Sequence, residues 1–372
     1  MTNGNGNGKT EHWVAETVSL LSLSLVHGLG YWTVRGIALS GLGFKQVLRA
    51  ESSAEFINYL VQAKCKNTSQ IANQIGEDWL KKRDELWKQG VKLYHQLDAQ
   101  GIKVIYFEQE YFPQSLREIS DPPKWLFVQG SISILHRPAL AIVGTRNPSE
   151  DGIFLANYVG ACLQYFNAVT VSGLALGIDQ IIHKKSIRAK VPTIAFIGTG
   201  ILQNYPSGSE KLRQAICENG GAIVSEYLPN QSYSAENFVH RNRLQAGLSD
   251  VIIPVEWKEK GGTSHTVKFA HKAQKKIVCL KLPDWSDSHS ELTLAKKLDA
   301  DIFTVPGEEP KFITTINESI SKKNSFAGQS QETEEEVQSS VNSKQAKNKN
   351  TELKNKQLLE NHPQQLSLFG SN

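Results

Sequence analysis

The stretch LAIVGTRN at residues 140–147 opens the part of the chain that decides the fold. It is the first of six short apolar segments, and the other five are AVTVSGLALGID from Ala168, PTIAFIGTG from Pro192, GAIVSEY from Gly221, DVIIPVEW from Asp250 and KIVCLKLP from Lys276. A continuous Val/Ile-rich run suits a strand that is buried on both faces. The amphipathic stretches between the runs are long enough for crossover helices. This alternation predicts an α/β domain built on a mostly parallel sheet.

Composition divides the chain into four parts. Residues 1–9 are rich in Gly and Asn and are expected to be disordered, whereas residues 10–100 carry apolar positions at helical spacing. We assign residues 101–320 to the sheet domain, with short lead-in strands predicted near 104–107 and 125–128. Residues 321–372 are mostly Lys, Glu, Gln, Ser and Asn. Such a tail cannot bury enough apolar area to offset its ordering entropy, so we expect it to be disordered.

The overall composition is mildly basic, with a net charge of +4 over 372 residues. This charge permits a polyanionic partner without requiring one. The four cysteines are far apart and form no CxxC pair, which favours reduced thiols over a disulfide framework or a zinc site. No apolar run reaches the ~18 residues that a membrane span needs, and the first residues lack the features of a signal peptide. We therefore expect a cytoplasmic protein without a membrane segment, a metal or a cofactor.

A glycine turn, HGLG at residues 27–30, separates two helix-like stretches in the amino-terminal part. It resembles a helix-hairpin-helix unit, in which backbone N–H groups after the turn are exposed to a phosphate. A simple turn between two packed helices explains the same pattern and is the favoured interpretation of this motif by itself.

Small, glycine-containing loops follow four of the predicted strands, and the carboxyl ends of parallel strands form the edge where open sheets bind ligands. The loops contain Gly144-Thr145-Arg146, then Ser172-Gly173 with Asp179, then Gly198 with Tyr205, and then Glu256 with GGTS at 261–264. A single glycine at such a turn commonly serves only to reverse the chain. Four such loops at one edge favour a phosphate-binding groove, to which Arg146 would add a charged fork.

A basic cluster, Arg241-Asn242-Arg243, comes just before the fifth apolar segment. Residues two apart on a helix point to different faces. One arginine is therefore expected to face the groove, and the other to pair with a carboxylate such as Glu226 or Glu256. Surface solvation explains each arginine equally simply when it is considered alone, but their position between two strand ends favours a functional role.

No catalytic set emerges from the sequence. The chain contains no GxxxxGK[ST] phosphate loop, no GxSxG elbow and no GxGxxG dinucleotide fingerprint, and its histidines lack a metal-ligand spacing. These absences favour a binding protein over an enzyme.

Together these motifs resemble the DprA/Smf family of DNA-processing proteins. The match rests on VGTRNPS at 143–149, VSGLALGID at 171–179 with His183, the GTG and YP elements of 198–206, SEY at 225–227 and FVHRNRLQAGLSD at 238–250. The resemblance implies an extended Rossmann-like domain, an amino-terminal domain of the sterile-alpha or helix-hairpin-helix type over residues 10–100, and a homodimer. It also implies a mediator that protects incoming single-stranded DNA and loads a RecA-type recombinase, in natural transformation or in repair.

The loops and the resemblance give one set of candidate residues for binding phosphates of single-stranded DNA. They are Gly144, Thr145, Arg146, Ser172, Gly173, Gly198, Arg241, Asn242 and Arg243. Phe238 or Tyr205 is a candidate for stacking a base, a contact worth ~1–3 kcal/mol per base, although core packing explains both rings about as well.

The chain departs from the family pattern in three places. Leu176 stands where the family usually carries Arg in its SGLARGID motif, and GGTSHT at 261–266 replaces SGSLIT. The low-complexity tail does not resemble the winged-helix-like carboxy-terminal domain of many members. DNA binding is therefore expected to rest on the groove, either alone or together with the amino-terminal domain.

A separate motif lies at Gln365-Leu366-Ser367-Leu368-Phe369. It resembles the QLSLF type of pentapeptide that binds the bacterial DNA polymerase sliding clamp. Two large apolar anchors on a polar tether are what a captured linear motif requires. The sequence therefore predicts the clamp as a further partner.

Two other functions stay open at this point. A nucleotide phosphoribohydrolase of the lysine-decarboxylase-like group shares such phosphate-binding loops, but its PGGxGTxxE element has no counterpart with a Glu in the nearest stretch, 260–268. A structural adaptor recruited by its tail would bind the clamp without affinity for DNA.

Overall fold

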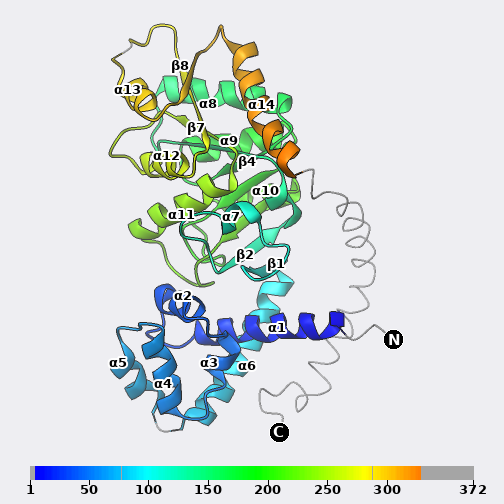
Figure 1. The fold of residues 1–372 in the computed structure, drawn as a ribbon, viewed down its shortest axis with the longest axis vertical. Coiled ribbons are helices and arrows are strands. Elements are labelled where there is room, and N and C mark those ends of the chain that lie inside the picture. Colours follow the sequence, from blue (N-terminus) through cyan, green and yellow to red (C-terminus); the bar gives the residue numbers. More distant parts are fainter. Residues whose placement is uncertain (1–4, 77, 287, 328–372) are drawn as a thin grey trace. The chain divides into compact units, whose positions relative to one another are not determined.

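The computed structural model describes residues 5–76, 78–286 and 288–327 (Figure 1). The predicted clamp-binding pentapeptide at 365–369, and most of the tail expected to be disordered, lie outside the described residues. Within the described ranges, no helix is both long enough and apolar enough to span a bilayer.

The described chain forms six helices before its first strand. They are α1 (Asn5–Leu23), α2 (Tyr31–Leu39), α3 (Phe44–Leu48), α4 (Ser53–Gln62), α5 (Thr68–Ile75) and α6 (Trp79–Ala99). Helices α1 and α6 approach closely at Gly90 of α6. A Cβ at this position would lie 2.1 Å from the Ser22 Oγ of α1. The HGLG motif is the turn between α1 and α2, and its Gly28 has φ +91°, in the left-handed region that favours glycine.

Helix α1 begins at Asn5, inside the segment 1–9 that its composition predicted to be disordered. The starting turn of a helix is costly to form, whereas each further residue adds a hydrogen bond at little cost. Val18 and Leu21, both buried, fix the helix further along. The helix can therefore extend upstream through residues that have little helical preference of their own.

Nine strands of the described chain form one sheet. They are β1 (Ile102–Tyr106), β2 (Trp125–Gly130), β3 (Ala139–Gly144), β4 (Val169–Ser172), β5 (Thr193–Phe196), β6 (Ala222–Ser225), β7 (Val251–Val255), β8 (Lys276–Lys281) and β9 (Asp301–Thr304). Their order is β1-β2-β6-β5-β4-β3-β7-β8-β9. The pairings from β6 to β9 in this order are parallel, whereas β1 and β2 add two antiparallel pairings at one edge. The six apolar segments are β3 to β8, so the predicted α/β fold with a mostly parallel sheet is confirmed.

Helices cover both faces of this sheet (Figure 1). On one face α8 (Glu150–Cys162), α9 (Ile178–Arg188) and α14 (Glu309–Ala327) pack their apolar side chains against the strands. On the other face lie α7 (Gln114–Arg117), α11 (Ala235–Leu248), α12 (Gly262–Lys272) and α13 (Ser290–Lys297). Helix α10 (Glu210–Glu218) connects β5 to β6. The central strands are therefore buried on both faces, which explains their continuous apolar runs.

The chain reverses its direction across the sheet after β6. From β3 it advances through β4 and β5 to β6, and α11 then carries it back to β7 on the other side of β3. In doubly wound sheets, ligands bind outside the carboxyl ends of the strands near such a reversal. On its way back, α11 brings residues 238–241 to the carboxyl ends of β4 and β5.

Candidate functional site

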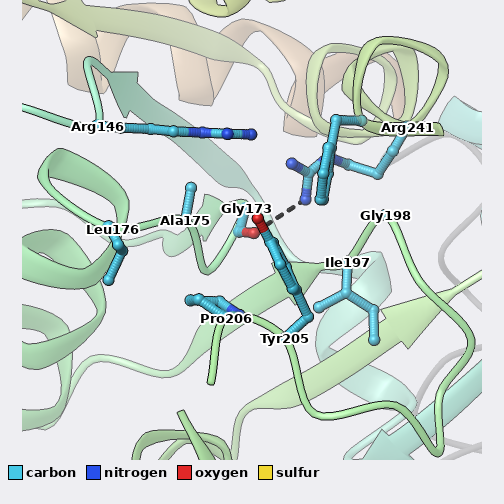
Figure 2. A pocket seen from close by; sticks show the side chains of 10 residues that line it. Arg146, Gly173, Ala175, Leu176, Ile197, Gly198, Tyr205, Pro206 and Arg241 are labelled. Carbon is cyan, nitrogen blue, oxygen red and sulfur yellow. Dashed lines mark hydrogen bonds between the residues drawn. The ribbon is translucent and has the colours of Figure 1, made fainter. Parts of the chain in front are cut away.

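A pocket opens at the carboxyl ends of β3, β4 and β5, beside the first turns of α11 (Figure 2). Its lining consists of Arg146 after β3, Gly173, Ala175 and Leu176 after β4, Ile197, Gly198, Tyr205 and Pro206 after β5, and Phe238 and Arg241 of α11. The structure therefore brings together three of the four loops that the sequence singled out. Four of the nine candidate phosphate-binding residues line this pocket, and so do both candidates for stacking.

Arg241 is a buried cation in the wall of the pocket, with 4% of its surface exposed. Its Nη1 donates hydrogen bonds to the Gly173 carbonyl at 3.0 Å and to the Phe196 carbonyl. Among the described residues, none accepts a hydrogen bond from Nη2. Burial lowers the pKa of Arg241 to about 10, a shift that the Asp179 carboxylate opposes, so the side chain is charged at neutral pH. A fixed guanidinium with an unused Nη2 is suited to an anionic ligand.

Gly173 is required by the close approach of two charged side chains. A Cβ at this position would lie 2.7 Å from both Arg241 Nη2 and Asp179 Oδ2. The Gly173 N–H donates to Asp179 Oδ2 at 3.0 Å, which holds that carboxylate beneath the loop. Burial raises the pKa of Asp179, against the attraction of Arg241. The glycine therefore makes room for the Arg241 and Asp179 side chains at the pocket wall.

Gly198 makes room in the same way for an aromatic ring. A Cβ there would lie 2.4 Å from Cδ1 of Phe238. The Phe238 ring lies 5.0 Å from the guanidinium carbon of Arg146, and its centroid is 5.2 Å from that of Tyr205. Arg146 itself is exposed, whereas both rings are partly buried. The pocket mouth thus combines a cation with aromatic faces.

Three further candidates support the loops without lining the pocket. Gly144 is packed against β7, since its Cβ would lie 2.1 Å from the Val255 carbonyl. The Thr145 N–H donates to the Glu256 carbonyl at 3.1 Å. Ser172 is buried, and its Oγ donates to the Ile142 carbonyl at 2.7 Å. These contacts hold the ends of β3 and β4 in place, and none of the three residues lines the pocket.

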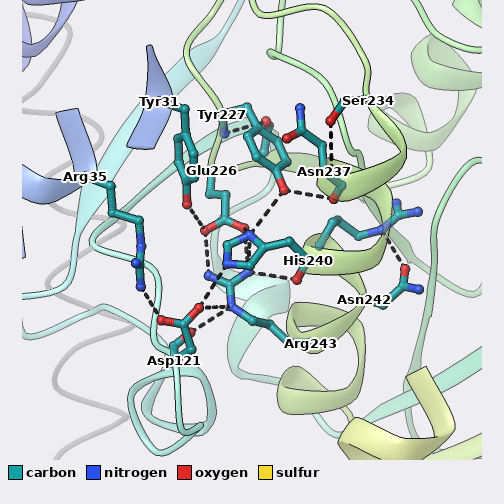
Figure 3. A network of polar contacts seen from close by, with 12 residues as sticks. Tyr31, Arg35, Asp121, Glu226, Tyr227, Ser234, Asn237, His240, Asn242 and Arg243 are labelled. Carbon is teal, nitrogen blue, oxygen red and sulfur yellow. Dashed lines mark hydrogen bonds and ion pairs between the residues drawn. The ribbon is translucent and has the colours of Figure 1, made fainter. Parts of the chain in front are cut away.

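Asn242 and Arg243 also point away from the pocket. Asn242 Nδ2 donates to the Gly262 carbonyl at 3.1 Å. Arg243 forms a two-pronged ion pair with Glu226, with Nη1 at 2.5 Å from Oε1 and Nη2 at 2.7 Å from Oε2 (Figure 3). The expectation that one arginine of the pair faces the groove while the other binds Glu226 agrees with this arrangement. The candidate role of Arg243 in binding phosphate does not agree with it. The guanidinium group of Arg243 is already paired with the carboxylates of Glu226 and Asp121.

The Arg243–Glu226 pair belongs to a polar network that joins α2 to the sheet (Figure 3). The Tyr31 hydroxyl of α2 donates to Glu226 Oε2 at 2.6 Å, and Arg35 of α2 pairs with Asp121. Burial disfavours the ionised form of Glu226, but the Arg243 guanidinium outweighs it and lowers the pKa of Glu226 to about 2. The network therefore stays ionised at neutral pH and fixes α11 from the side opposite the pocket residue Arg241.

His240, next to Arg241 on α11, is part of the same network. Its Nε2 lies 2.9 Å from Asp121 Oδ2, and its Nδ1 lies 3.2 Å from Glu226 Oε1. Burial disfavours the imidazolium form, but hydrogen bonds to Asp121 and Glu226 outweigh it and raise the pKa of His240 above its ordinary value.

The fourth loop that the sequence singled out serves a different purpose. Glu256 follows β7 with φ +46°, and its Oε2 accepts a hydrogen bond from the Ser149 N–H at 2.8 Å. Ser149 is the residue that caps α8. Neither Glu256 nor residues 261–266 line the pocket. Because β7 lies beyond β3, on the far side from β4 and β5, its loop contacts the loop after β3 but does not line the pocket.

Ala175, Ile197 and Pro206 line the pocket although none of them was a candidate binding residue. Ala175 and Ile197 lie close to Gly173 and Gly198, and Pro206 follows Tyr205, so their own apolar side chains did not distinguish them. Their placement depends on how the loops after β4 and β5 fold over each other.

Comparison with known proteins places the chain in a family. Residues 103–305 match the profile of the family described as DNA recombination-mediator protein A, and these residues are more than half of the chain. The chain belongs to this family. All ten residues that line the pocket fall inside the matched span, whereas Tyr31 and Arg35 of the polar network precede it.

Curated relatives in the family agree with this result. The DNA processing protein DprA of Bacillus subtilis is 36% identical over 165 residues, which are 44% of this chain and 55% of that protein. Protein Smf of Escherichia coli is 32% identical over 187 residues, which are 50% of each chain. The chain thus spans about half the length of the curated relatives that it matches.

Two solved structures of family members are also similar to this chain. DprA from Streptococcus pneumoniae has a TM-score of 0.56 at 23% identity, covering 78% of this chain and 94% of that one, and shows the shared fold. DprA from Helicobacter pylori has a TM-score of 0.50 at 30% identity, covering 57% of this chain and 95% of that one. The latter structure is described as revealing a unique mode of binding single-stranded DNA.

Proposed function

We propose that this chain is a recombination mediator that binds single-stranded DNA in the pocket between β3, β4, β5 and α11. The observation that carries the proposal is the guanidinium of Arg241, fixed by two carbonyls with Nη2 unused, close to the exposed Arg146 over the Phe238 ring. Cations attract backbone phosphates, and aromatic faces stack unpaired bases. The single-stranded DNA binding described for the Helicobacter pylori relative supports the same ligand.

Binding without catalysis is the second part of the proposal. None of the ten described residues that line the pocket carries a carboxylate, an imidazole, a thiol or an aliphatic hydroxyl. These groups supply most nucleophiles and general acids or bases. The alternative, a nucleotide phosphoribohydrolase, would be favoured if the purified protein released free base from nucleoside monophosphates.

The wider role includes partners and organisation that the pocket itself does not specify. We propose that the protein acts in the cytoplasm as a homodimer, protects incoming single strands and loads a RecA-type recombinase onto them. We also keep the division into residues 1–9, 10–100, 101–320 and 321–372 as a proposal. The family's description as a recombination mediator supports the loading step. Light scattering tests the dimer, and recombinase filament growth on single strands covered by a single-strand-binding protein tests the loading.

The pocket assignment is tested by replacing its exposed cation. We expect Arg146→Ala to weaken binding to an unstructured oligonucleotide and to lower the slope of log affinity against log salt by ~1, because one phosphate contact is lost. Fluorescence anisotropy across salt concentrations measures both quantities. The same oligonucleotide annealed to its complement should bind more weakly than the single strand, because paired bases cannot stack on protein rings.

A matched control is Arg188→Ala, which removes another exposed arginine at the last residue of α9, outside the pocket lining. Its binding and its salt slope should equal those of the wild type. Arg241→Lys tests the buried cation while it keeps the charge. Wild-type affinity in both Arg146→Ala and Arg241→Lys would refute the pocket assignment.

A further inference from the structure

Three aromatic rings lie side by side where the pocket meets the surface. Tyr205 comes from the loop after β5, Phe238 from α11, and Tyr233 from the segment just before α11. The Tyr205 centroid lies 4.6 Å from that of Tyr233 and 5.2 Å from that of Phe238. The Tyr233 and Phe238 planes meet at 20° with centroids 6.3 Å apart. The Tyr205 plane is inclined by 30° to that of Tyr233 and by 35° to that of Phe238. These separations lie in the range in which aromatic rings pack against one another.

Tyr233 is the outermost of the three rings. Tyr205 and Phe238 line the pocket and are partly buried, whereas Tyr233 is 58% exposed and lies outside the lining. Its hydroxyl forms no hydrogen bond to any residue in the described ranges. The cluster of rings therefore extends from the pocket lining to an exposed residue, Tyr233.

The segment that carries Tyr233 is held firmly although the ring is exposed. The Gly200 N–H donates to the Gln231 carbonyl at 2.8 Å. Asn237 Nδ2 donates to the Ser232 carbonyl at 3.5 Å, and the Asn237 N–H donates to Ser234 Oγ at 3.0 Å, which caps α11. These bonds flank Tyr233 on both sides. The backbone that carries the ring is thus fixed before a ligand binds. Little conformational entropy of this segment is therefore lost when a ligand stacks on the ring.

We propose that Tyr233 is a second base-stacking position, which takes the base next to the nucleotide held in the pocket. This inference rests on the proposed function and adds the route of the DNA strand. The strand would run outward from the cations Arg146 and Arg241. It would then cross the rings of Phe238 and Tyr205 and reach Tyr233. The occupant is an unpaired base of single-stranded DNA, since the nearby cations attract the phosphates that connect successive bases. Stacking uses the π face that every base has, so the position tolerates any sequence.

The test compares ring removal with ring retention in the full chain. Tyr233→Ala is expected to weaken binding to oligo(dT) about five-fold, the lower end of the range for stacking on aromatic rings. Tyr233→Phe and Tyr233→Trp should bind as the wild type does. The matched control is Tyr165→Ala, because Tyr165 is 57% exposed but lies at the end of a short 3-10 helix outside the pocket lining.

An oligonucleotide with one abasic site separates stacking from other effects. Its abasic position is moved stepwise along the strand. At one position, removal of the base should weaken binding to the wild type about five-fold. It should not further weaken binding to Tyr233→Ala. Equal losses in the two proteins at every position would overturn the inference.

The outcomes also distinguish this inference from the proposed function. If Arg146→Ala weakens binding and Tyr233→Ala does not, the pocket assignment stands and the second stacking position is refuted. If neither Arg146→Ala nor Arg241→Lys weakens binding, the proposed function itself fails. Thermal unfolding of each variant shows whether the fold is intact.

Discussion

Arg241 and Arg243 lie two residues apart on α11, yet their guanidinium groups have different roles. Arg241 is fixed by backbone carbonyls and presents Nη2 at the pocket, whereas Arg243 is held by Glu226. The sequence predicted that the two would diverge, because a helix turns about 200° over two residues. It did not show which arginine faces the pocket, because that depends on how α11 is rotated against the sheet.

Leu176 is the lining residue where a gain of binding is expected. It lines the pocket, is 54% exposed, and stands where the resemblance to the family leads one to expect arginine. We predict that Leu176→Arg strengthens binding to single-stranded DNA and steepens the salt dependence by ~1, because a phosphate contact is added. Anisotropy titrations at several salt concentrations measure both effects.

Leu176→Gln is the control for size and polarity without charge, and it should leave the salt dependence unchanged. An unchanged salt dependence in Leu176→Arg as well would mean that the strand does not pass this residue.

Among the elements, helix α11 contributes most to the site. Its pocket residues are Phe238 and Arg241, and its network residues are His240 and Arg243, so one helix carries both functions. The network binds α11 to α2 through Glu226 and Asp121. A buried ion pair is costly to break, because removing one partner leaves the other charge unpaired. The network therefore sets the rotation of α11 that aims Arg241 into the pocket.

His240 makes the stability of this network depend on pH. Its pKa is raised in the folded protein, so its contribution is fully present below the unfolded value of about 6.5 and is lost as pH rises through the folded value. We predict that the difference in unfolding free energy between wild type and His240→Gln shrinks as pH rises above about 6.5. Urea unfolding at pH values from about 5.5 to 8.5 measures this difference.

His271→Gln serves as the control, because His271 is exposed in the last turn of α12 and takes no part in the network. The difference between wild type and this control should not follow the same pH course. A His240→Gln difference that is constant over the range would show that the imidazole does not gain its proton from folding.

For the whole molecule, the pocket depends on the order of the strands. Loops after β3, β4 and β5 meet because these strands are neighbours, and the loop after β7 is excluded because β7 lies on the other side of β3. The order of the strands therefore separates the three loops that line the pocket from the one that does not.

The tail prediction also concerns the whole molecule, since the motif at 365–369 is about 120 residues further along the chain than the last pocket residue, Arg241. We predict that a bacterial sliding clamp binds the full chain and that the double variant Leu368→Ala/Phe369→Ala abolishes this binding, because both apolar anchors are lost. Surface plasmon resonance with immobilised clamp measures it.

The same double variant should bind single-stranded DNA as the wild type does, because none of the residues that line the pocket is changed. Equal clamp binding by the wild type and the double variant would refute the role of residues 365–369 in clamp binding. A loss of DNA binding in the double variant would show that the tail also affects the pocket.

The sequence by itself determined the α/β fold, the strands β3 to β8, the family and the loops in which the pocket lies. It could do so because buried strands need continuous apolar runs and sharp βα turns need small residues, and both leave local patterns. It did not determine that Gly144, Thr145, Ser172, Asn242 and Arg243 lie outside the pocket lining, or that Tyr233 lies beside Tyr205 and Phe238. Those facts depend on strand order, on the rotation of α11 and on the packing of distant loops, and only the tertiary structure brings these residues into contact.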